Sequence, residues 1–429
     1  MNLKKLIILF FAGIVIAAVS WKVYDYQKNR KNYSPVINEN ELINLDNIYT
    51  TSDKSISTFQ EQLNLNPDNT GILLKLGVAY YLKAKETGDP EFISKAENAL
   101  IKSIEKDPEN YIAVTELARV FLSKFNYNKA LETSLKAIEI NPYSTYPYGV
   151  LSEVQIKLGM YDKASETLQK LSDTRKNPVY FSGVSELKNI KGDSWSAIDE
   201  MRSAVSAGLP TAENTAWNRF RLGMLFYNSG DPKTAEEIFG FLIKDFPEYG
   251  QGYFAMGKIK LHKKEYPESI ELFTKAVDIL PIPEFLISLG DAYLLSGDNK
   301  SSDEIYLKAK SVIEKYKQYG YDTDIEFSDF YADRNYQLQE TLEKIRKIHD
   351  AGNQSIELYN SFAWLCYKLD NNIEALKNID SALSTGIKDP LIFFHAGKIF
   401  EKAGQIEKSK EYLDFALKIN PYYEILYSK

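Results

Sequence analysis

Apolar and small residues recur along most of the chain with a helical spacing. At nine positions an Ala or Ser is followed seven residues later by Ala, Ser or Leu, in most cases with a larger apolar residue between the two. Spacings of three and four residues place these side chains on one face of a helix. The nine positions are Ala96, Ala130, Ala164, Ala197, Ala235, Ser269, Ser302, Ala375 and Ser409.

A second helix is predicted upstream of each of these positions. Twelve residues earlier, eight of the nine units hold another small residue, such as Gly257. Between the two helices lie Gly-Asp pairs that start at Gly192, Gly230 and Gly297, and glycine allows the left-handed backbone that ends a helix. A proline such as Pro142 follows many of the second helices. The predicted unit is therefore helix, short turn, helix and proline.

Each helix pair has an apolar face that it cannot bury alone. Facing small residues let two helix axes approach closely, and stacking further pairs covers the remaining apolar surface. The pattern therefore predicts an all-α solenoid rather than a single compact core.

The period of 34 residues, the small positions and the endings AIEINP and ALKINP resemble the tetratricopeptide repeat family. The resemblance covers roughly residues 54 to 422 and implies a right-handed α-solenoid of stacked helix-turn-helix repeats. An insertion of seven residues, about KETGDPE, is expected to lengthen the first full turn. Residues 310 to 355 lose the phase of the repeat and resemble a degenerate unit with a shortened first helix.

These patterns divide the chain into five segments. We expect a membrane anchor or signal segment at residues 1–24 and a polar tether at 25–53. An array with an N-terminal cap helix and about seven repeats follows at 54–310. The irregular segment with its degenerate repeat occupies 311–355, and two further repeats occupy 356–429.

The first segment contains fourteen apolar residues from Leu6 to Val19. Continued to Tyr24, a helix would be about 28 Å long, just enough to cross a bilayer core. A cleaved secretory signal is the alternative, since the same length suits its apolar region. We expect a single-pass membrane protein whose soluble domain is extracytoplasmic, periplasmic in a Gram-negative cell. Secretion after cleavage and a cytoplasm-facing domain remain alternatives.

Composition disfavours several functions. The formal net charge of -7 gives no attraction to phosphate backbones, so no nucleic acid partner is expected. One cysteine and three distant histidines disfavour a structural metal site, and neither a metal nor a cofactor is expected. Cys366 lies in the apolar stretch FAWLCY and is expected to be buried. Gly252 to Lys258 has phosphate-loop spacing but falls inside a predicted helix, and no catalytic motif is present.

The family resemblance implies a concave groove lined by the first helices of successive pairs. Aromatic and charged residues at matching positions suit recognition of a peptide segment or a partner helix. Some of these residues, especially Phe220 and Trp364, can instead pack between adjacent pairs. The predicted groove residues are Arg119, Tyr146, Trp217, Phe220, Phe254, Lys258, Trp364, Phe394 and Lys398.

The leading hypothesis is a membrane-tethered scaffold that binds a protein or peptide partner and carries out no catalysis. A second hypothesis is a regulatory or accessory subunit of an envelope biogenesis or secretion complex. A third is an enzyme with its site in residues 311–355, for which the sequence offers no motif.

Overall fold

The computed structural model describes residues 52–172 and 178–427 of the 429-residue chain. The predicted anchor at residues 1–24 and nearly all of the predicted tether at 25–53 lie outside the described residues. Within these ranges, no helix combines the length and the apolar character needed to cross a bilayer.

Every regular element in the described ranges is a helix, and 22 helices follow one another from α3 to α24. A single helix, α3 (Ser52–Leu65), precedes ten helix pairs, and α24 (Tyr423–Tyr427) follows them. The first helices of the pairs are α4 (Thr70–Thr87), α6 (Tyr111–Ser123), α8 (Tyr146–Lys157), α10 (Pro178–Ile190), α12 (Glu213–Asn228), α14 (Gly250–His262), α16 (Pro283–Ser296), α18 (Ser328–Asp333), α20 (Ile356–Lys368) and α22 (Pro390–Lys402). The second helices are α5 (Pro90–Lys106), α7 (Tyr127–Ile140), α9 (Tyr161–Ser172), α11 (Ser194–Ala207), α13 (Pro232–Asp245), α15 (Tyr266–Ile279), α17 (Asn299–Gln318), α19 (Leu338–Asp350), α21 (Asn372–Leu383) and α23 (Ile406–Ile419).

The small residues of the repeat are the contact points inside the pairs. All nine Ala and Ser positions are buried, none with more than 4% of its surface exposed. A Cβ placed on Gly257 of α14 would lie 2.7 Å from a ring carbon of Phe273 in α15. Ser269 donates a hydrogen bond of 3.0 Å to the Gly257 carbonyl, and Ser302 donates one of 2.9 Å to Gly290. The predicted close approach of the two helices is therefore confirmed.

The turns inside the pairs follow the predicted chemistry. Gly192, Gly230 and Gly297 have φ angles of 76°, 84° and 90°. The aspartate after each glycine begins the second helix by accepting a hydrogen bond from a backbone amide three residues later, as in the contact of 3.2 Å between Asp193 and Ser196. The glycine ends one helix and its neighbour begins the next.

The insertion near residue 85 does not lengthen the turn, contrary to the expectation. Gly88 and Asp89 alone separate α4 from α5. The extra residues instead extend the two helices to 18 and 17 residues, because Gly88 supplies the left-handed cap and Asp89 with Pro90 starts a new helix at once.

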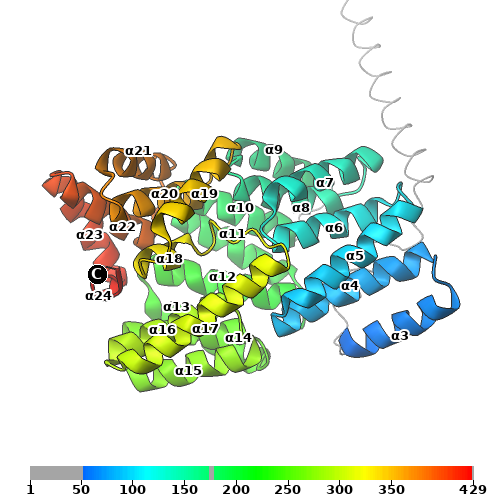
Figure 1. Cartoon of the computed structure of the whole chain (residues 1–429), viewed down its shortest axis with the longest axis horizontal. Helices are drawn as coiled ribbons and strands as arrows, with labels where there is room; N and C mark the ends of the chain where they lie inside the picture. Colours follow the sequence, from blue (N-terminus) through cyan, green and yellow to red (C-terminus); the bar gives the residue numbers. More distant parts are fainter. Residues whose placement is uncertain (1–51, 173–177, 428–429) are drawn as a thin grey trace, which may run out of the picture.

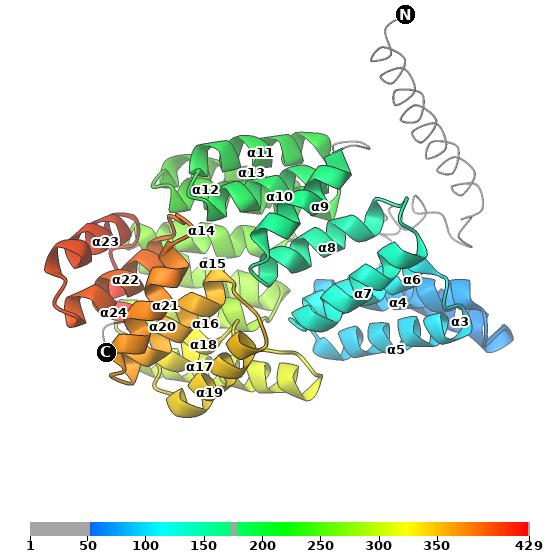
Figure 2. The same cartoon turned by 90° about the horizontal axis from the view of Figure 1, so that it is seen from above.

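The solenoid winds back onto itself. We call α4–α13 the first coil and α16–α24 the second coil. The turns inside the first four pairs and the end of α12 contact the loops that follow α15, α17, α19, α21 and α23, and we call this line of contacts the seam. Its five contacts join Gly88 with Leu280 and Ile282, Phe125 with Tyr321 and Phe327, Leu158 with Gln354, Gly192 with Gly386, and Tyr227 with Asn420 and Tyr422. Figure 1 shows α17 running toward the turn between α4 and α5, and Figures 1 and 2 both show α24 beside helices of the middle of the chain.

Apart from its first contact, the seam has a nearly constant register. At the first contact, Lys315 and Tyr316 of α17 donate hydrogen bonds to Asp89 and Gly88, which are 226 and 228 positions earlier. At other contacts, hydrogen bonds join residues that are 193, 195, 196 and 199 positions apart. Divided by the 34-residue period, these separations correspond to between five and six helix pairs in one superhelical turn. Backbone groups take part, since the amides of Asp322 and Gln354 donate bonds of 2.9 and 3.1 Å to the carbonyls of Lys124 and Leu158.

Candidate partner-binding surface

The first helices of the pairs face a common interior, and we call the side that faces it the inner face. Ion pairs join first helices that are far apart along the chain. Lys85 of α4 lies 2.5 Å from Glu213 of α12, and Lys157 of α8 lies 3.8 Å from Glu357 of α20. Charged side chains from both coils therefore meet on the inner face.

Two of the predicted groove residues, Arg119 and Tyr146, form one polar cluster. Arg119 donates hydrogen bonds to Glu116 and, over 2.9 Å, to the Tyr146 hydroxyl, which itself donates to Glu116. The Arg119 guanidinium also lies 4.9 Å from the ring centre of Tyr81. These contacts orient both side chains and join α6 to α8.

Trp217 is the predicted aromatic residue that remains most open to solvent. Its side chain is 42% exposed, and Val179 on α10 is 46% exposed. Arg221, one helical turn after Trp217, forms an ion pair with Glu186 of α10 and lies 5.8 Å from the Trp217 ring centre. Since Glu186 follows Val179 by two turns, both apolar side chains lie on the helix faces that carry the ion pair.

Phe220 and Phe254 are closed off by neighbouring helices, with 9% and 3% of their surface exposed. Phe254 stacks on Phe285 of α16 with ring centres 4.6 Å apart. Lys258 lies 5.3 Å from the Phe254 ring centre. Burial lowers the pKa of Lys258, although the carboxylates of Glu284 and two aspartates act in the opposite direction. Only Lys258 of these three residues presents a functional group to the interior.

The predicted residues of the second coil are mostly inaccessible. Trp364 and Phe394 are fully buried. Trp364 stacks on His395 at 4.0 Å and donates a hydrogen bond of 2.7 Å to Asp333. Lys398 pairs with Glu401 and with Glu424 of the segment that contains α24. In this conformation, the two aromatic side chains pack between helices and offer no surface to a partner. Cys366 is fully buried, as expected.

Sequence reasoning missed three members of this surface, Val179, Glu186 and Arg221. Arg221 lies four residues after Trp217, so helical spacing alone would have placed both on one face. Val179 and Glu186 carried no comparable signal, because their importance depends on the contact between α10 and α12.

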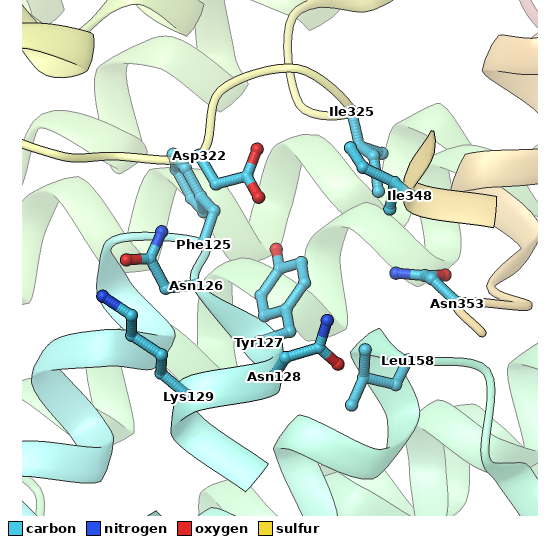
Figure 3. Close-up of a pocket in the computed structure, with 10 residues that line it drawn as sticks. All are labelled: Phe125, Asn126, Tyr127, Asn128, Lys129, Leu158, Asp322, Ile325, Ile348 and Asn353. Carbon is cyan, nitrogen blue, oxygen red and sulfur yellow. The ribbon is translucent and has the colours of Figure 1, made fainter. Parts of the chain in front are cut away.

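A small pocket interrupts the seam between its second and third contacts. Its volume is about 270 Å³, and Figure 3 shows the Tyr127 hydroxyl, the Asp322 carboxylate and the Asn353 amide directed toward the same space. Sites for drug-sized ligands have volumes of roughly 300–1,000 Å³. Asp322 and Asn128 on its rim are exposed. The pocket is therefore a gap between coils and not an enclosed site.

Within the described residues, no group of three or more His, Cys, Asp or Glu side chains could hold a metal ion. Gly252 to Lys258, which have phosphate-loop spacing, lie inside α14. Their backbone amides are therefore in helical geometry and do not form a phosphate-binding loop.

Comparison with known proteins identifies part of the array. One family model for the tetratricopeptide repeat matches residues 220–281, and a second matches residues 392–423. No curated protein matches the chain.

Three solved structures are similar to parts of the chain. The tetratricopeptide repeat protein YrrB, described as having an unusual peptide-binding site, is 24% identical, with a TM-score of 0.28, over 43% of this chain and 94% of YrrB. A tetratricopeptide repeat protein from Parabacteroides merdae is 16% identical, with a TM-score of 0.43, over 63% of this chain and 98% of its own. PilF of Pseudomonas aeruginosa is 16% identical, with a TM-score of 0.38, over 49% and 96% of the two chains. The helix pairs, their buried small residues and the two family matches together show that this all-helical solenoid contains tetratricopeptide repeats.

Proposed function

We propose that the protein is an interaction scaffold that binds a partner protein or peptide segment on the inner face around Trp217. The observation that carries this proposal is the exposure of Trp217 and Val179 beside the ion pair of Arg221 with Glu186. Tryptophan and arginine are enriched among the residues that dominate binding energy, and an exposed apolar centre with a polar rim is typical of an interface.

The proposal has four further parts. The superhelix is right-handed, as the family resemblance implies, and the protein carries out no catalysis. Residues 1–24 tether it to a membrane with the soluble part extracytoplasmic. By binding a partner outside the cytoplasm, the protein would act as an accessory subunit of an envelope complex. Reporter fusions after residue 429 test the topology: activity of an extracytoplasmic reporter supports it, and activity of a cytoplasmic reporter contradicts it.

Site-specific photocrosslinking tests the surface itself. A benzoylphenylalanine at Val179 should crosslink one discrete partner in cells. Trp217→Ala in the same chain should reduce the adduct about thirtyfold, the effect of losing roughly 2 kcal/mol at an interface centre.

Phe241 is the matched control position, because it is 63% exposed but lies on the second helix α13. A crosslinker at Phe241 should not capture the same partner. Equal adducts from both positions, or an adduct at Val179 that does not depend on Trp217, would contradict the proposed surface.

A further inference from the structure

The last described helix, α24, packs against α22 through aromatic side chains. The ring centres of Tyr423 and Tyr427 lie 5.6 and 5.9 Å from that of Phe394. Tyr427 also makes an edge contact with His395, with ring centres 6.3 Å apart. Two aromatic side chains one helical turn apart therefore cover Phe394 and His395 of α22.

Two lysines add polar contacts to the same segment. Lys398 of α22 lies 3.3 Å from Glu424, and Lys368 of α20 donates a hydrogen bond of 3.2 Å to the backbone carbonyl of Tyr427. An ion pair to a side chain together with a bond to the main chain fixes both the identity and the position of a bound segment. We call the surface formed by Phe394, His395, Lys368 and Lys398 the α22 slot.

The place of α24 in the repeat explains this packing. It follows the ending INP at residues 419–421, where the other repeats begin a new first helix. Its five residues are too few to make a stable helix alone, so its order depends on the contacts with the slot and with helices earlier in the chain, among them α16. Leu426 supplies the second set of contacts, since it belongs to the same apolar cluster as residues of α12 to α16.

Beneath the α22 slot lies a buried histidine nitrogen that has no hydrogen-bond partner among the described residues. The Nδ1 atom of His395 lies 2.9 Å from Asn360, whereas its Nε2 is buried without a hydrogen-bond partner in the described part of the chain. An unpaired buried polar atom costs free energy. The packing of α24 over the slot thus leaves the Nε2 atom of His395 without a hydrogen bond from the described residues.

We propose that α24 is a displaceable occupant of the α22 slot, and that the slot also accepts a helical segment of a partner protein. That segment carries aromatic residues at positions i and i+4 and a glutamate at i+1, the pattern of Tyr423, Glu424 and Tyr427. This inference is independent of the surface around Trp217, because it concerns α20, α22 and α24 and a different set of side chains.

Because α24 belongs to the same chain as the α22 slot, any partner segment must compete with it for the slot. A short linker gives a segment an effective concentration in the millimolar range, so α24 competes strongly with any free segment. The apparent affinity for a partner equals its intrinsic affinity for the open slot multiplied by the fraction of time that the slot is open. A partner must therefore bind more tightly than α24 or act when α24 is removed.

A labelled peptide tests the proposal. The probe is a fluorescein-labelled peptide of residues 418–429, measured by fluorescence anisotropy against two proteins, the full chain and a chain that ends after Tyr422. The shortened chain retains the seam contacts of Asn420 and Tyr422. It should bind the peptide saturably, and the full chain should bind at least about tenfold more weakly.

A charge exchange checks the register of binding. Lys398→Glu in the shortened chain should weaken binding about two- to fivefold, as expected for an ion pair near the surface. A peptide with Glu424→Lys should restore the affinity for this variant. A peptide with alanine in place of both tyrosines should not bind.

The full chain with Tyr423→Ala and Tyr427→Ala is the second test protein, in case the shortened chain does not fold. It should bind the wild-type peptide better than the unmodified full chain does. The proposal is overturned if folded protein with an empty slot fails to bind the peptide, if full and shortened chains bind equally, or if the alanine peptide binds as well as the native one.

Discussion

The hydroxyl of Tyr227, at the end of α12, donates a hydrogen bond of 2.5 Å to the side-chain oxygen of Asn420, 193 residues later in the chain. Both residues are buried, and the Tyr422 hydroxyl lies 3.2 Å from that of Tyr227. A solenoid whose repeats contact only their neighbours would not bring such distant residues together. The seam therefore gives this array tertiary contacts that a simple stack of helix pairs lacks.

Removing the Tyr227 hydroxyl should destabilise the protein. Tyr227→Phe leaves the buried Asn420 oxygen without this donor, which costs about 1–3 kcal/mol. Chemical denaturation followed by circular dichroism measures the change. Tyr253→Phe is the matched control, because Tyr253 is only half-buried on α14, and it should change stability by less than about 0.5 kcal/mol. Equal effects of the two variants would show that the bond across the seam contributes nothing.

Two glycines in helices predict opposite effects of one substitution. Gly257→Ala should lower the free energy of unfolding by about 1–3 kcal/mol, because the new Cβ lies 2.7 Å from the Phe273 ring. Gly240→Ala should raise it by about 0.5–1 kcal/mol, since no atom lies within 4 Å of a Cβ there and alanine favours a helix. Thermal and denaturant unfolding of both variants provide the comparison. A Gly257→Ala variant as stable as Gly240→Ala would contradict the close contact of α14 with α15.

Asp329 predicts a dependence of stability on pH. Burial raises the pKa of its carboxyl to about 6, despite hydrogen bonds from Ser361 and Asn360. Between pH 4 and 6 the folded protein therefore binds more protons at this site than the unfolded chain, so the contribution of Asp329 to stability falls as the pH rises through this window. Asp329→Asn should remove this loss, which amounts to about 1–3 kcal/mol.

Asp193 is the matched control for the pH profile. A hydrogen bond from Ser196 lowers the pKa of its carboxyl, so its contribution is present at neutral pH and is lost on acidification. Asp193→Asn should therefore change the slope of the free energy of unfolding against pH in the opposite direction to Asp329→Asn. The Asp329 slope lies between about pH 4 and 6 and the Asp193 slope below about pH 4, so denaturant unfolding between about pH 2 and 8 measures both. Parallel profiles for wild type and Asp329→Asn would contradict the assignment.

The repeat unit was predictable because its chemistry is local. The nine small residues, the glycine turns and the aspartate caps act within one helix pair, and spacing along the chain identifies them. The insertion shows the limit, since Gly88 and Asp89 could form a long turn or a tight one. The structure makes it tight, and the Gly88 turn packs against Leu280 and Ile282 of the seam.

The candidate surface was only partly predictable, because exposure depends on the superhelix. Trp217 lies six residues before the small residue Gly223 of α12, and Trp364 lies one residue after the small residue Ala363 of α20, so the two positions differ by seven residues but share one helix face. Trp217 is 42% exposed, whereas Trp364 is fully buried. Trp364 is buried because His395 and α18 pack against it, and α18 belongs to the segment that departs from the repeat. Helical spacing places both tryptophans on the same helix face and therefore does not predict this difference in exposure.

Amide hydrogen exchange at Asp322 and Gln354 tests the closed superhelix most directly. These amides lie in loops, and their hydrogen bonds to Lys124 and Leu158 exist only when the second coil contacts the first. The account predicts exchange at least about 100-fold slower than in an unstructured loop. Gly159→Val, whose side chain would overlap the Gln354 backbone, should abolish the protection of Gln354. Exchange of both amides at the rate of an open loop in the unmodified protein would show that the two coils do not contact each other in solution.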